Sequence, residues 1–221
     1  MELSDAMRTT GAIRTFTDEP VSDELVRSVL DDARFAPSGG NRQGWRVAVV
    51  RDPTLRRRLA DACAPAWNEY VAQTAAGETP FSVTTESSID LDQARRTPAS
   101  NPLLDDLDSA PVVLVVAVDL SALAVMDRDL DRPSIVGGAS VYPFCQNVML
   151  AARDRGLGGV MTTFLARVEP EVSEPLGLPD GHALAAMIVL GHPVRHLTRL
   201  RRAEVEEFTT IDRFDAQPFN G

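Results

Sequence analysis

The sequence predicts an α+β protein with one central mixed or antiparallel sheet that helices flank on both sides. Three short, bulky apolar runs indicate the buried strands of this sheet: residues 45–50, 110–118 and 185–190. Between these runs, apolar residues recur at helical spacing, which indicates helices packed on the sheet. At 221 residues the chain is long enough for one substantial core, so we expect a single domain over residues 1–221.

The predicted elements follow one another in an order that capping and breaking residues help to define. Ser22 precedes two acidic residues and an apolar helical repeat, as expected of a helix N-cap. The first strand comes next, and a second helix is predicted from Pro53. After the second strand, a long helix that is buried nearly all round is predicted to stop at Gly156. Residues 159–166 leave this helix without an assigned element, and the third strand ends at Gly191.

The composition is typical of a soluble globular protein, with 44% hydrophobic and 24% charged residues. The formal net charge of −10 argues against nucleic acid or an anionic membrane surface as the main partner. The longest apolar run is too short to span a bilayer, and the N-terminus has no apolar core of signal-peptide length. Cys63 and Cys145 stand far apart without metal spacing, which is typical of reduced thiols. We therefore expect a cytoplasmic protein.

Two segments fit no regular element. Residues 77–104 lose the helical period and gain Thr, Ser and Pro, which leaves two interpretations open, a disordered insertion and a mobile lid. The tail, residues 203–221, carries Phe208, Phe214 and Phe219 in a charged and irregular stretch. These side chains have no helix or strand face of their own, so we expect them to pack on the parent domain or on a partner subunit.

Several common catalytic and cofactor-binding motifs are absent from the sequence. The chain has no lysine, which excludes a phosphate-binding loop that ends in Gly-Lys-Ser/Thr. It also lacks the Gly-x-Ser-x-Gly elbow of α/β-hydrolases, and its Gly-Leu-Gly-Gly-Val run is not the dinucleotide fingerprint. His182, His192 and His196 lie near the last strand without the spacing of metal ligands, so we predict no metal site.

Three polar clusters remain, and together they suit one anionic, aromatic ligand. In residues 8–14, two arginines flank two threonines, and guanidinium forks match the oxygens of a phosphate. In residues 37–43, glycines permit close approach of another group while Ser, Asn and Gln supply hydrogen bonds. The third cluster is the run Arg-Leu-Arg-Arg at 199–202. Taken singly, each cluster also has an ordinary interpretation: solvated helix-end residues, a tight helix-to-strand connection and a charged surface run.

Taken together, the clusters resemble the flavin-dependent nitroreductase family in their order and in their spacing from the chain ends. The most specific stretch is Ala-Pro-Ser-Gly-Gly-Asn-Arg-Gln-Gly-Trp at 36–45, which is similar to the family's Ala-Pro-Ser-x-x-Asn-x-Gln-Pro-Trp loop. The Gly-Leu-Gly end of the long helix and the Gly-His-Pro turn at 191–193 are also similar. The resemblance covers about residues 8–202 and leaves 66–104 unplaced, as a variable, lid-like segment.

The resemblance implies that FMN is the cofactor and that it lies at the interface of a homodimer. Arg14 matches the family's second arginine and is expected at the phosphate or the ribityl chain. The family's first Arg and Ser fall near Gly11 and Ala12, where this sequence departs from the pattern. We expect Arg8 and Thr10 to substitute for them.

The loop that carries the second cluster is expected to face the flavin ring. Pro37, Ser38 and Gly39 match the ring-facing positions of the family, and Asn41 and Gln43 lie beside them. In this interpretation the glycines keep side chains away from the ring.

Two further groups of residues are expected at the flavin. The Met-Thr-Thr-Phe run is similar to the deiodinase branch of the family, in which a threonine points at the flavin N5, so Thr162 or Thr163 is the candidate catalytic residue. Arg199, Arg201 and Arg202 fall where the family places its C-terminal phosphate arginine, and we expect one or two of them at the site.

The resemblance implies an NADH- or NADPH-dependent oxidoreductase that works by ping-pong hydride transfer through the flavin. The expected acceptor is a small conjugated molecule, such as a nitroaromatic or a quinone, and a deazaflavin is an alternative donor. Trp67 and Tyr70 line the substrate face in this interpretation, or they are ordinary helix packing. Two alternative functions on the same fold stay open: a non-catalytic flavin-binding or flavin-storage protein, and a dehalogenating or flavin-destroying enzyme. The tail, residues 203–221, is expected to extend over the partner subunit.

Overall fold

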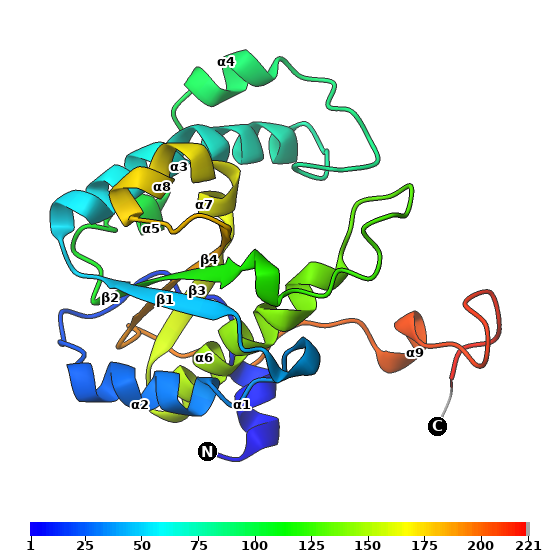
Figure 1. Cartoon of the computed structure of the whole chain (residues 1–221), viewed down its shortest axis with the longest axis horizontal. Coiled ribbons are helices and arrows are strands. Elements are labelled where there is room, and N and C mark those ends of the chain that lie inside the picture. The colour runs from blue at the N-terminus through cyan, green and yellow to red at the C-terminus, as the bar shows by residue number, and fades with distance from the viewer. Residues whose placement is uncertain (220–221) are drawn as a thin grey trace.

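A four-stranded sheet with the strand order β1-β2-β4-β3 forms the centre of the molecule (Figure 1). The structure is a computed structural model that describes residues 1–219. Every neighbouring pair of strands is antiparallel. The strands of this sheet are β1 (Trp45–Val50), β2 (Val112–Asp119), β3 (Gly158–Thr162) and β4 (His182–Gly191). The α-helices are α1 (Leu3–Thr9), α2 (Asp23–Ala33), α3 (Pro53–Ala75), α4 (Leu91–Arg96), α5 (Pro102–Asp105), α6 (Tyr142–Asp154), α7 (Phe164–Arg167), α8 (Glu169–Leu176) and α9 (Val205–Phe208). Three 3₁₀ helices, η1 (Gly39–Asn41), η2 (Leu120–Ala122) and η3 (Val136–Ser140), lie in the connections.

The central strand β2 supplies apolar side chains to both faces of the sheet. Leu114 and Val116 belong to the core on the face of α2 and α6, whereas Val113 and Val115 belong to the core on the opposite face. All four are almost completely buried. Because alternate side chains of a strand point to opposite faces, a strand covered on both sides needs a continuous apolar run. The run that predicted this strand therefore reflects the two helical layers around it.

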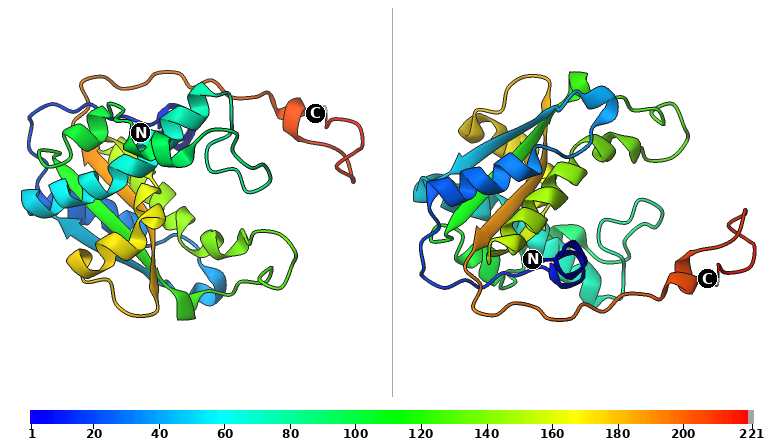
Figure 2. Two further views of the ribbon diagram at one scale, coloured as in Figure 1. Left: turned by 90° about the horizontal axis from the view of Figure 1, so that it is seen from above. Right: turned by 90° about the horizontal axis from the view of Figure 1, so that it is seen from below.

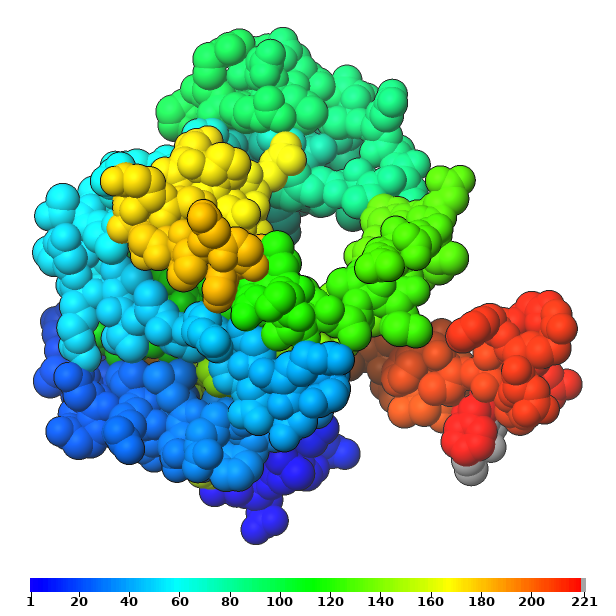
Figure 3. Space-filling view, in the orientation of Figure 1, coloured from blue at the N-terminus to red at the C-terminus, as the bar shows by residue number. Residues whose placement is uncertain are grey.

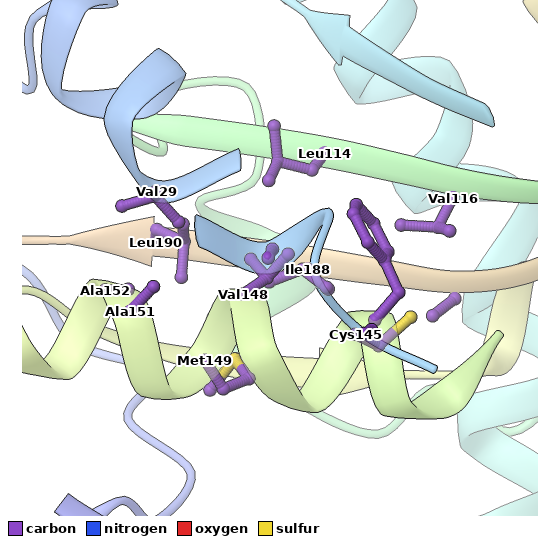
Figure 4. Close-up of a cluster of buried hydrophobic side chains, with 14 of the residues drawn as sticks. Val29, Leu114, Val116, Cys145, Val148, Met149, Ala151, Ala152, Ile188 and Leu190 are labelled. Carbon is purple, nitrogen blue, oxygen red and sulfur yellow. The ribbon is translucent and has the colours of Figure 1, made fainter. Parts of the chain in front are cut away.

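Helices α2 and α6 cover one face of the sheet, as Figure 2 shows from above and below. Figure 4 shows Cys145 and Val148 of α6 directed toward the strands that carry Leu114 and Ile188. Burial of each large aliphatic side chain contributes roughly 1.5–3 kcal/mol to stability. Ser22 caps α2 as predicted, since its hydroxyl accepts a hydrogen bond from the backbone N–H of Leu25 at 3.2 Å.

Helices α3, α5, α7 and α8 cover the other face. A buried arginine, Arg56 of α3, joins this layer to the sheet. Its guanidinium donates to the carbonyl oxygens of Val50 at 2.8 Å, Ala110 at 2.6 Å and Asp108 at 3.3 Å. Burial lowers the pKa of this guanidinium from its ordinary value, but three carbonyl acceptors compensate for the lost water.

The α+β prediction is confirmed, and the structure contains the three expected strands and a fourth. Strand β1, expected to be buried, instead lies at an edge of the sheet because it pairs with β2 alone, and most of its side chains are partly or fully exposed. β3 lies within the stretch that begins after the long helix, and it pairs with β4 from Gly158 opposite Gly191 to Thr162 opposite Met187. The long helix α6 begins at Tyr142, whereas the glycines that precede it form η3. Within residues 1–219 no helix is both long enough and apolar enough to span a bilayer.

The lid-like segment, residues 66–104, is folded in the structure. Its first part is the end of α3, and α4 and α5 follow. Asn68 of α3 holds the returning chain, because its side chain donates to Arg95 O at 3.0 Å and accepts from Ala99 N at 2.9 Å. Glu78 accepts hydrogen bonds from Ser87 and Ser88, which lower the pKa of its carboxyl to about 2. Figure 3 shows an opening between this segment and the loop that follows β2.

The described part of the tail, residues 203–219, extends away from the rest of the chain (Figures 1 and 3). It contains α9 and an isolated antiparallel bridge between Thr210 and Pro218. Phe208, Phe214 and Phe219 are all exposed, with Phe214 fully exposed to solvent. The parent domain therefore does not bury them. Residues 220–221 of the predicted tail lie outside the described residues.

Replacement of the buried arginine tests the joint between α3 and the sheet. We expect Arg56→Met to lower the free energy of unfolding by about 2–4 kcal/mol, since carbonyl groups lose charged donors inside the protein. Urea denaturation at one protein concentration measures this change, with Arg58→Met as the matched control. Arg58 is exposed on the same helix, 3.7 Å from Glu174, so its loss is expected to cost less than about 0.5 kcal/mol. Equal midpoints for the two variants would contradict the role of Arg56.

Candidate functional site

The N-terminal segment, residues 10–18, crosses the ends of β3 and β4 and so fixes the position of the first cluster. The backbone N–H of Ile13 donates to Gly159 O at 2.7 Å, and that of Thr17 donates to His192 O at 2.8 Å. The segment lies close to the sheet because Gly158 has no side chain: a Cβ there would lie 2.7 Å from Ile13 Cδ1. Arg8 lies on α1, which directly precedes this segment.

The C-terminal arginines reach the same place through packing on Gly11. A Cβ at Gly11 would lie 2.5 Å from Leu197 Cδ1 and 2.7 Å from Leu200 Cδ2, so the missing side chain makes room for these leucines. A groove of about 1580 Å³ results between α1 and residues 198–207. Its lining residues are Leu3, Ser4, Met7, Arg8, Thr198, Arg199, Leu200, Arg201, Arg202, Ala203, Glu204 and Glu207. We call it the arginine groove.

The arginine groove is suited to a phosphate. Arg8, Arg199 and Arg201 form no ion pair within residues 1–219, and Arg202 donates to the carbonyl oxygen of Arg201 at 2.7 Å. The acidic residues of the groove cap the helix α9, since Glu207 Oε1 accepts from the backbone N–H of Glu204 at 2.9 Å. Unpaired guanidinium groups that share one groove provide charged donors for an anion.

Two predicted phosphate residues occupy other positions. The Thr10 hydroxyl donates to Ala6 O at 2.7 Å, so its proton is used within α1 and only its oxygen lone pairs are free. Arg14 lines a different cavity, of about 220 Å³, together with Asp18 and residues 102–111. In the single chain Arg14 and Arg8 therefore do not share a cavity.

The loop of residues 37–43 forms a tight, hydrogen-bonded turn that ends in β1. The Ser38 hydroxyl accepts from Gln43 N at 2.9 Å, and Gly39 N donates to the hydroxyl of Ser140 at 3.0 Å. Gly40 has φ +60°, in the left-handed region that glycine adopts without strain. The side chains of Asn41 and Gln43 bond to each other, with Gln43 Nε2 donating to Asn41 Oδ1 at 3.0 Å. The Arg42 side chain lies over the glycines of this turn, since its Nη1 donates to Gly39 O at 2.9 Å.

The candidate catalytic threonines lie at the end of β3, beside an aromatic cluster. Thr162 Oγ1 accepts from Phe164 N at 3.4 Å, and Thr163 is exposed. The ring of Phe164 meets Trp67 and Tyr70 edge-on, at centroid distances of 5.9 and 6.0 Å. This aromatic cluster places apolar rings next to the threonines. Phe164 was not among the predicted site residues, although its place directly after the two threonines is a sequence signal for it.

The predicted residues thus lie at four places on one chain, of which the cavity that contains Arg14 is one. The arginine groove unites Arg8 with Arg199, Arg201 and Arg202, while the turn of residues 37–43 and the end of β3 form separate surfaces. No motif in the sequence pointed to Leu197 and Leu200, whose packing on Gly11 brings the arginines together.

The thiols and the histidines contribute no further chemistry. Burial raises the pKa of Cys63 and of Cys145 to about 12, so both stay protonated and unreactive near neutral pH. His196 Nε2 lies 3.1 Å from Gly156 O, and burial lowers the pKa of this imidazole. Among residues 1–219, no cluster of three or more His, Cys, Asp or Glu side chains has an arrangement suited to a metal ion.

Residues 7–192 match the Nitroreductase family over most of the chain. The chain belongs to the nitroreductase family. It is 30% identical to the nitrobenzene nitroreductase of Ectopseudomonas oleovorans, over 95% of this chain and 96% of that protein. It is 28% identical to the chloronitrobenzene nitroreductase of Comamonas testosteroni, over 95% of this chain and 96% of that protein. The prediction of a flavin-dependent oxidoreductase of this family is therefore confirmed.

The nitroreductase fold is confirmed by solved structures as well. A crystal structure of oxidized iodotyrosine deiodinase bound to FMN and 3-iodo-L-tyrosine has a TM-score of 0.66 to this chain. The two chains are 24% identical, and the match covers 97% of this chain and 100% of the deiodinase chain. At this identity the similarity shows the fold alone.

Addition of a side chain at Gly11 tests how the arginine groove is held together. We expect Gly11→Ala to displace Leu197 and Leu200, and to increase tryptic cleavage after Arg199 about fivefold, since cleavage follows the population of the locally opened segment. Mass spectrometry of a time course measures the cleavage rate. The matched control is Gly137→Ala, because a Cβ at Gly137 has its nearest neighbour at 3.5 Å, an ordinary contact. The same cleavage rate in both variants would contradict this account of Gly11.

Proposed function

We propose that this chain is an FMN-dependent oxidoreductase that reduces nitroaromatic compounds, or similar conjugated acceptors such as quinones, with NADH or NADPH. The observation that carries the proposal is the arginine groove, which gathers guanidinium groups from both ends of a chain whose net charge is −10. Because the protein as a whole is acidic, these arginines do not belong to a general basic surface. Their concentration in one groove indicates a binding site for an anion. The terminal phosphate of FMN is such an anion.

The residues of the groove fit this phosphate. Arg8, Arg199 and Arg201 have guanidinium groups free of ion pairs within the described residues, and a planar fork donates two parallel hydrogen bonds to phosphate oxygens. Thr10 fits less well as a donor, since its hydroxyl proton is already used. We therefore assign the phosphate to Arg8 together with Arg199 or Arg201. Arg14 is the candidate for another part of the cofactor.

The remaining site residues would orient the flavin ring and exclude water from it. The glycines of the turn would let a flat ring approach the backbone once the exposed side chain of Arg42, which donates to Gly39 O at 2.9 Å, moves aside. The hydroxyl of Thr162 or Thr163 is the candidate hydrogen-bond donor to the flavin N5. Bound FMN supplies the hydride-transfer chemistry that the side chains of this protein lack.

A pair of protomers would complete the site. The turn of residues 37–43 and the arginine groove form separate surfaces of one chain, so a second copy is the simplest source of the missing surface. The tail supports this arrangement, because it extends from its own domain with five exposed apolar side chains: Val205, Phe208, Ile211, Phe214 and Phe219. Exposed apolar groups gathered in this way are typical of an interaction surface.

Reductive dehalogenation is the second candidate function. The structural neighbour bound to 3-iodo-L-tyrosine is a deiodinase, and the Met-Thr-Thr-Phe run of this chain, which ends at Phe164, resembles that branch of the family. Anaerobic turnover of a nitroaromatic and of an iodinated phenol, each with NADH or NADPH, separates the two activities. A flavin that none of these donors reduces would instead favour a storage protein, and a deazaflavin donor is tested in the same way.

The visible spectrum and the affinity for FMN test the proposed cofactor site. We expect a yellow protein, and we expect Arg8→Gln combined with Arg199→Gln to weaken FMN binding at least about 100-fold, since two charged hydrogen bonds are lost. Quenching of flavin fluorescence during titration of the apoprotein measures the affinity. Arg58→Gln, which changes an exposed arginine of α3 outside the groove, is the matched control. A colourless protein that does not bind added FMN would refute the proposal.

Removal of the tail tests the proposed pairing of protomers. We expect a chain that stops after Arg202 to sediment as a monomer and to lose flavin, because the exposed side chains of the tail no longer contact the partner. Analytical ultracentrifugation with detection at the flavin absorbance band measures both properties together. A stable dimer with full flavin content after this truncation would show that the tail is dispensable for assembly.

A further inference from the structure

Residues 195–203 lie between β4 and α9 and carry the C-terminal arginines of the arginine groove. Figure 2 shows them as an extended chain without helix or strand. Every charged residue among them is an arginine. We call residues 195–203 the C-terminal strap.

A single hydrogen bond joins the C-terminal strap to the rest of the chain. His196 Nε2 lies 3.1 Å from Gly156 O, and this is the only hydrogen bond that the strap forms with other parts of the described chain, residues 1–219. Its other close contacts are apolar, since its two leucines pack on Gly11. The position of Arg199, which stands between these leucines in the sequence, therefore depends on His196.

The hydrogen-bond partner of His196 determines which ring nitrogen carries the proton. Because a carbonyl oxygen can only accept, Nε2 must donate to Gly156 O, and Nδ1 of the neutral imidazole is left as an acceptor. Nδ1 is buried and has no hydrogen-bond partner in the part of the chain that the structure describes. Protonation would place a charged N–H donor there without an acceptor, which costs more than a neutral nitrogen does. The surroundings of His196 thus favour the uncharged imidazole.

The charges near His196 also disfavour its protonation. Arg153 of α6 repels a proton on the imidazole, and it meets α1 through an uncharged partner, the Thr9 hydroxyl, at 3.3 Å. Asp154, the next residue of α6, is already paired with the N-terminal ammonium group of Met1 at 2.6 Å. Burial and the charge of Arg153 lower the pKa of His196 from its ordinary value of about 6.5 and outweigh the hydrogen bond to the carbonyl, which raises it.

We propose that His196 is a positioning residue of the cofactor site: its neutral imidazole holds the C-terminal strap against the end of α6, and its protonation releases the strap together with its arginines. This inference rests on the proposed function, because it concerns the arginines assigned to the FMN phosphate. His196 does not line the arginine groove, so it acts through the strap and takes no part in the chemistry.

The proposal fixes the direction of the pH dependence. The released strap lets the imidazole take up a proton at its ordinary pKa of about 6.5, whereas the attached strap excludes that proton until the pH is lower. Flavin affinity is therefore complete above about pH 6.5 and decreases as the pH falls below this value. One proton changes the affinity by at most about tenfold for each pH unit.

The pH dependence of flavin binding tests the proposal. Between about pH 7.5 and about pH 5.5, we expect the Kd for FMN to rise about fivefold more in the parent than in His196→Gln, whose amide donates to Gly156 O without titrating. Protonation of the FMN phosphate in this range affects both proteins alike, so the comparison removes it. His182→Gln, at the opposite end of β4, is the matched control and should keep the full pH dependence. Quenching of flavin fluorescence measures each Kd. The same pH dependence in the parent and in His196→Gln would overturn the proposal.

Proteolysis of the flavin-free protein separates failure of this inference from failure of the proposed function. At about pH 7.5 we expect His196→Ala to increase tryptic cleavage after Arg199 about fivefold, and His196→Gln to stay within about twofold of the parent, because glutamine retains the hydrogen bond. His182→Ala is the control for loss of an imidazole. Equal cleavage of the parent and of His196→Ala would overturn the inference. Faster cleavage of His196→Ala alone supports it even if FMN does not bind at any pH, a result that counts against the proposed function alone.

Discussion

Close approach of the two chain ends to the edge of the sheet is the constraint on which the candidate site depends. Two positions without side chains make it possible: Gly158 admits Ile13, and Gly11 admits Leu197 and Leu200. Through these contacts the N-terminal and C-terminal segments lie against each other near the start of β3. The arginines that they carry, almost 200 residues apart in sequence, consequently share one groove. Steric space, rather than attraction between charges, brings these like-charged groups together.

The three strands that could be predicted carry apolar runs: β2 and β4 are central and buried by two helical layers, whereas β1 lies at an edge of the sheet. In β2, every side chain from Val112 to Val118 faces one core or the other, so the sequence shows a continuous apolar run. β3 lies at the edge of the sheet and contains two glycines and an exposed Met161, so neither an apolar run nor a strict alternation marks it. Its pairing with β4 comes from tertiary contacts that local sequence does not report.

The sequence motifs predicted which residues belong to the site, but they did not predict how these residues are arranged in space. Arg8 and the arginines after the last strand could be identified by their order along the chain, and the groove unites them. Arg14 belongs to the same motif, yet it faces a cavity on another part of the molecule. Arg8 lies on α1, whereas Arg14 lies on the segment of residues 10–18 that crosses the sheet.

The apolar tail also affects the solubility of the single chain. The single chain exposes Phe208, Phe214 and Phe219 on an arm that its own domain leaves uncovered. Such an arm favours nonspecific association with other exposed apolar surfaces, and this association increases with protein concentration. The surplus of acidic groups, 32 against 22 basic ones, opposes this by mutual repulsion between copies. The solubility of the chain thus depends on the attraction between the exposed phenylalanines and the repulsion between acidic surfaces. Added salt screens the repulsion and therefore favours precipitation.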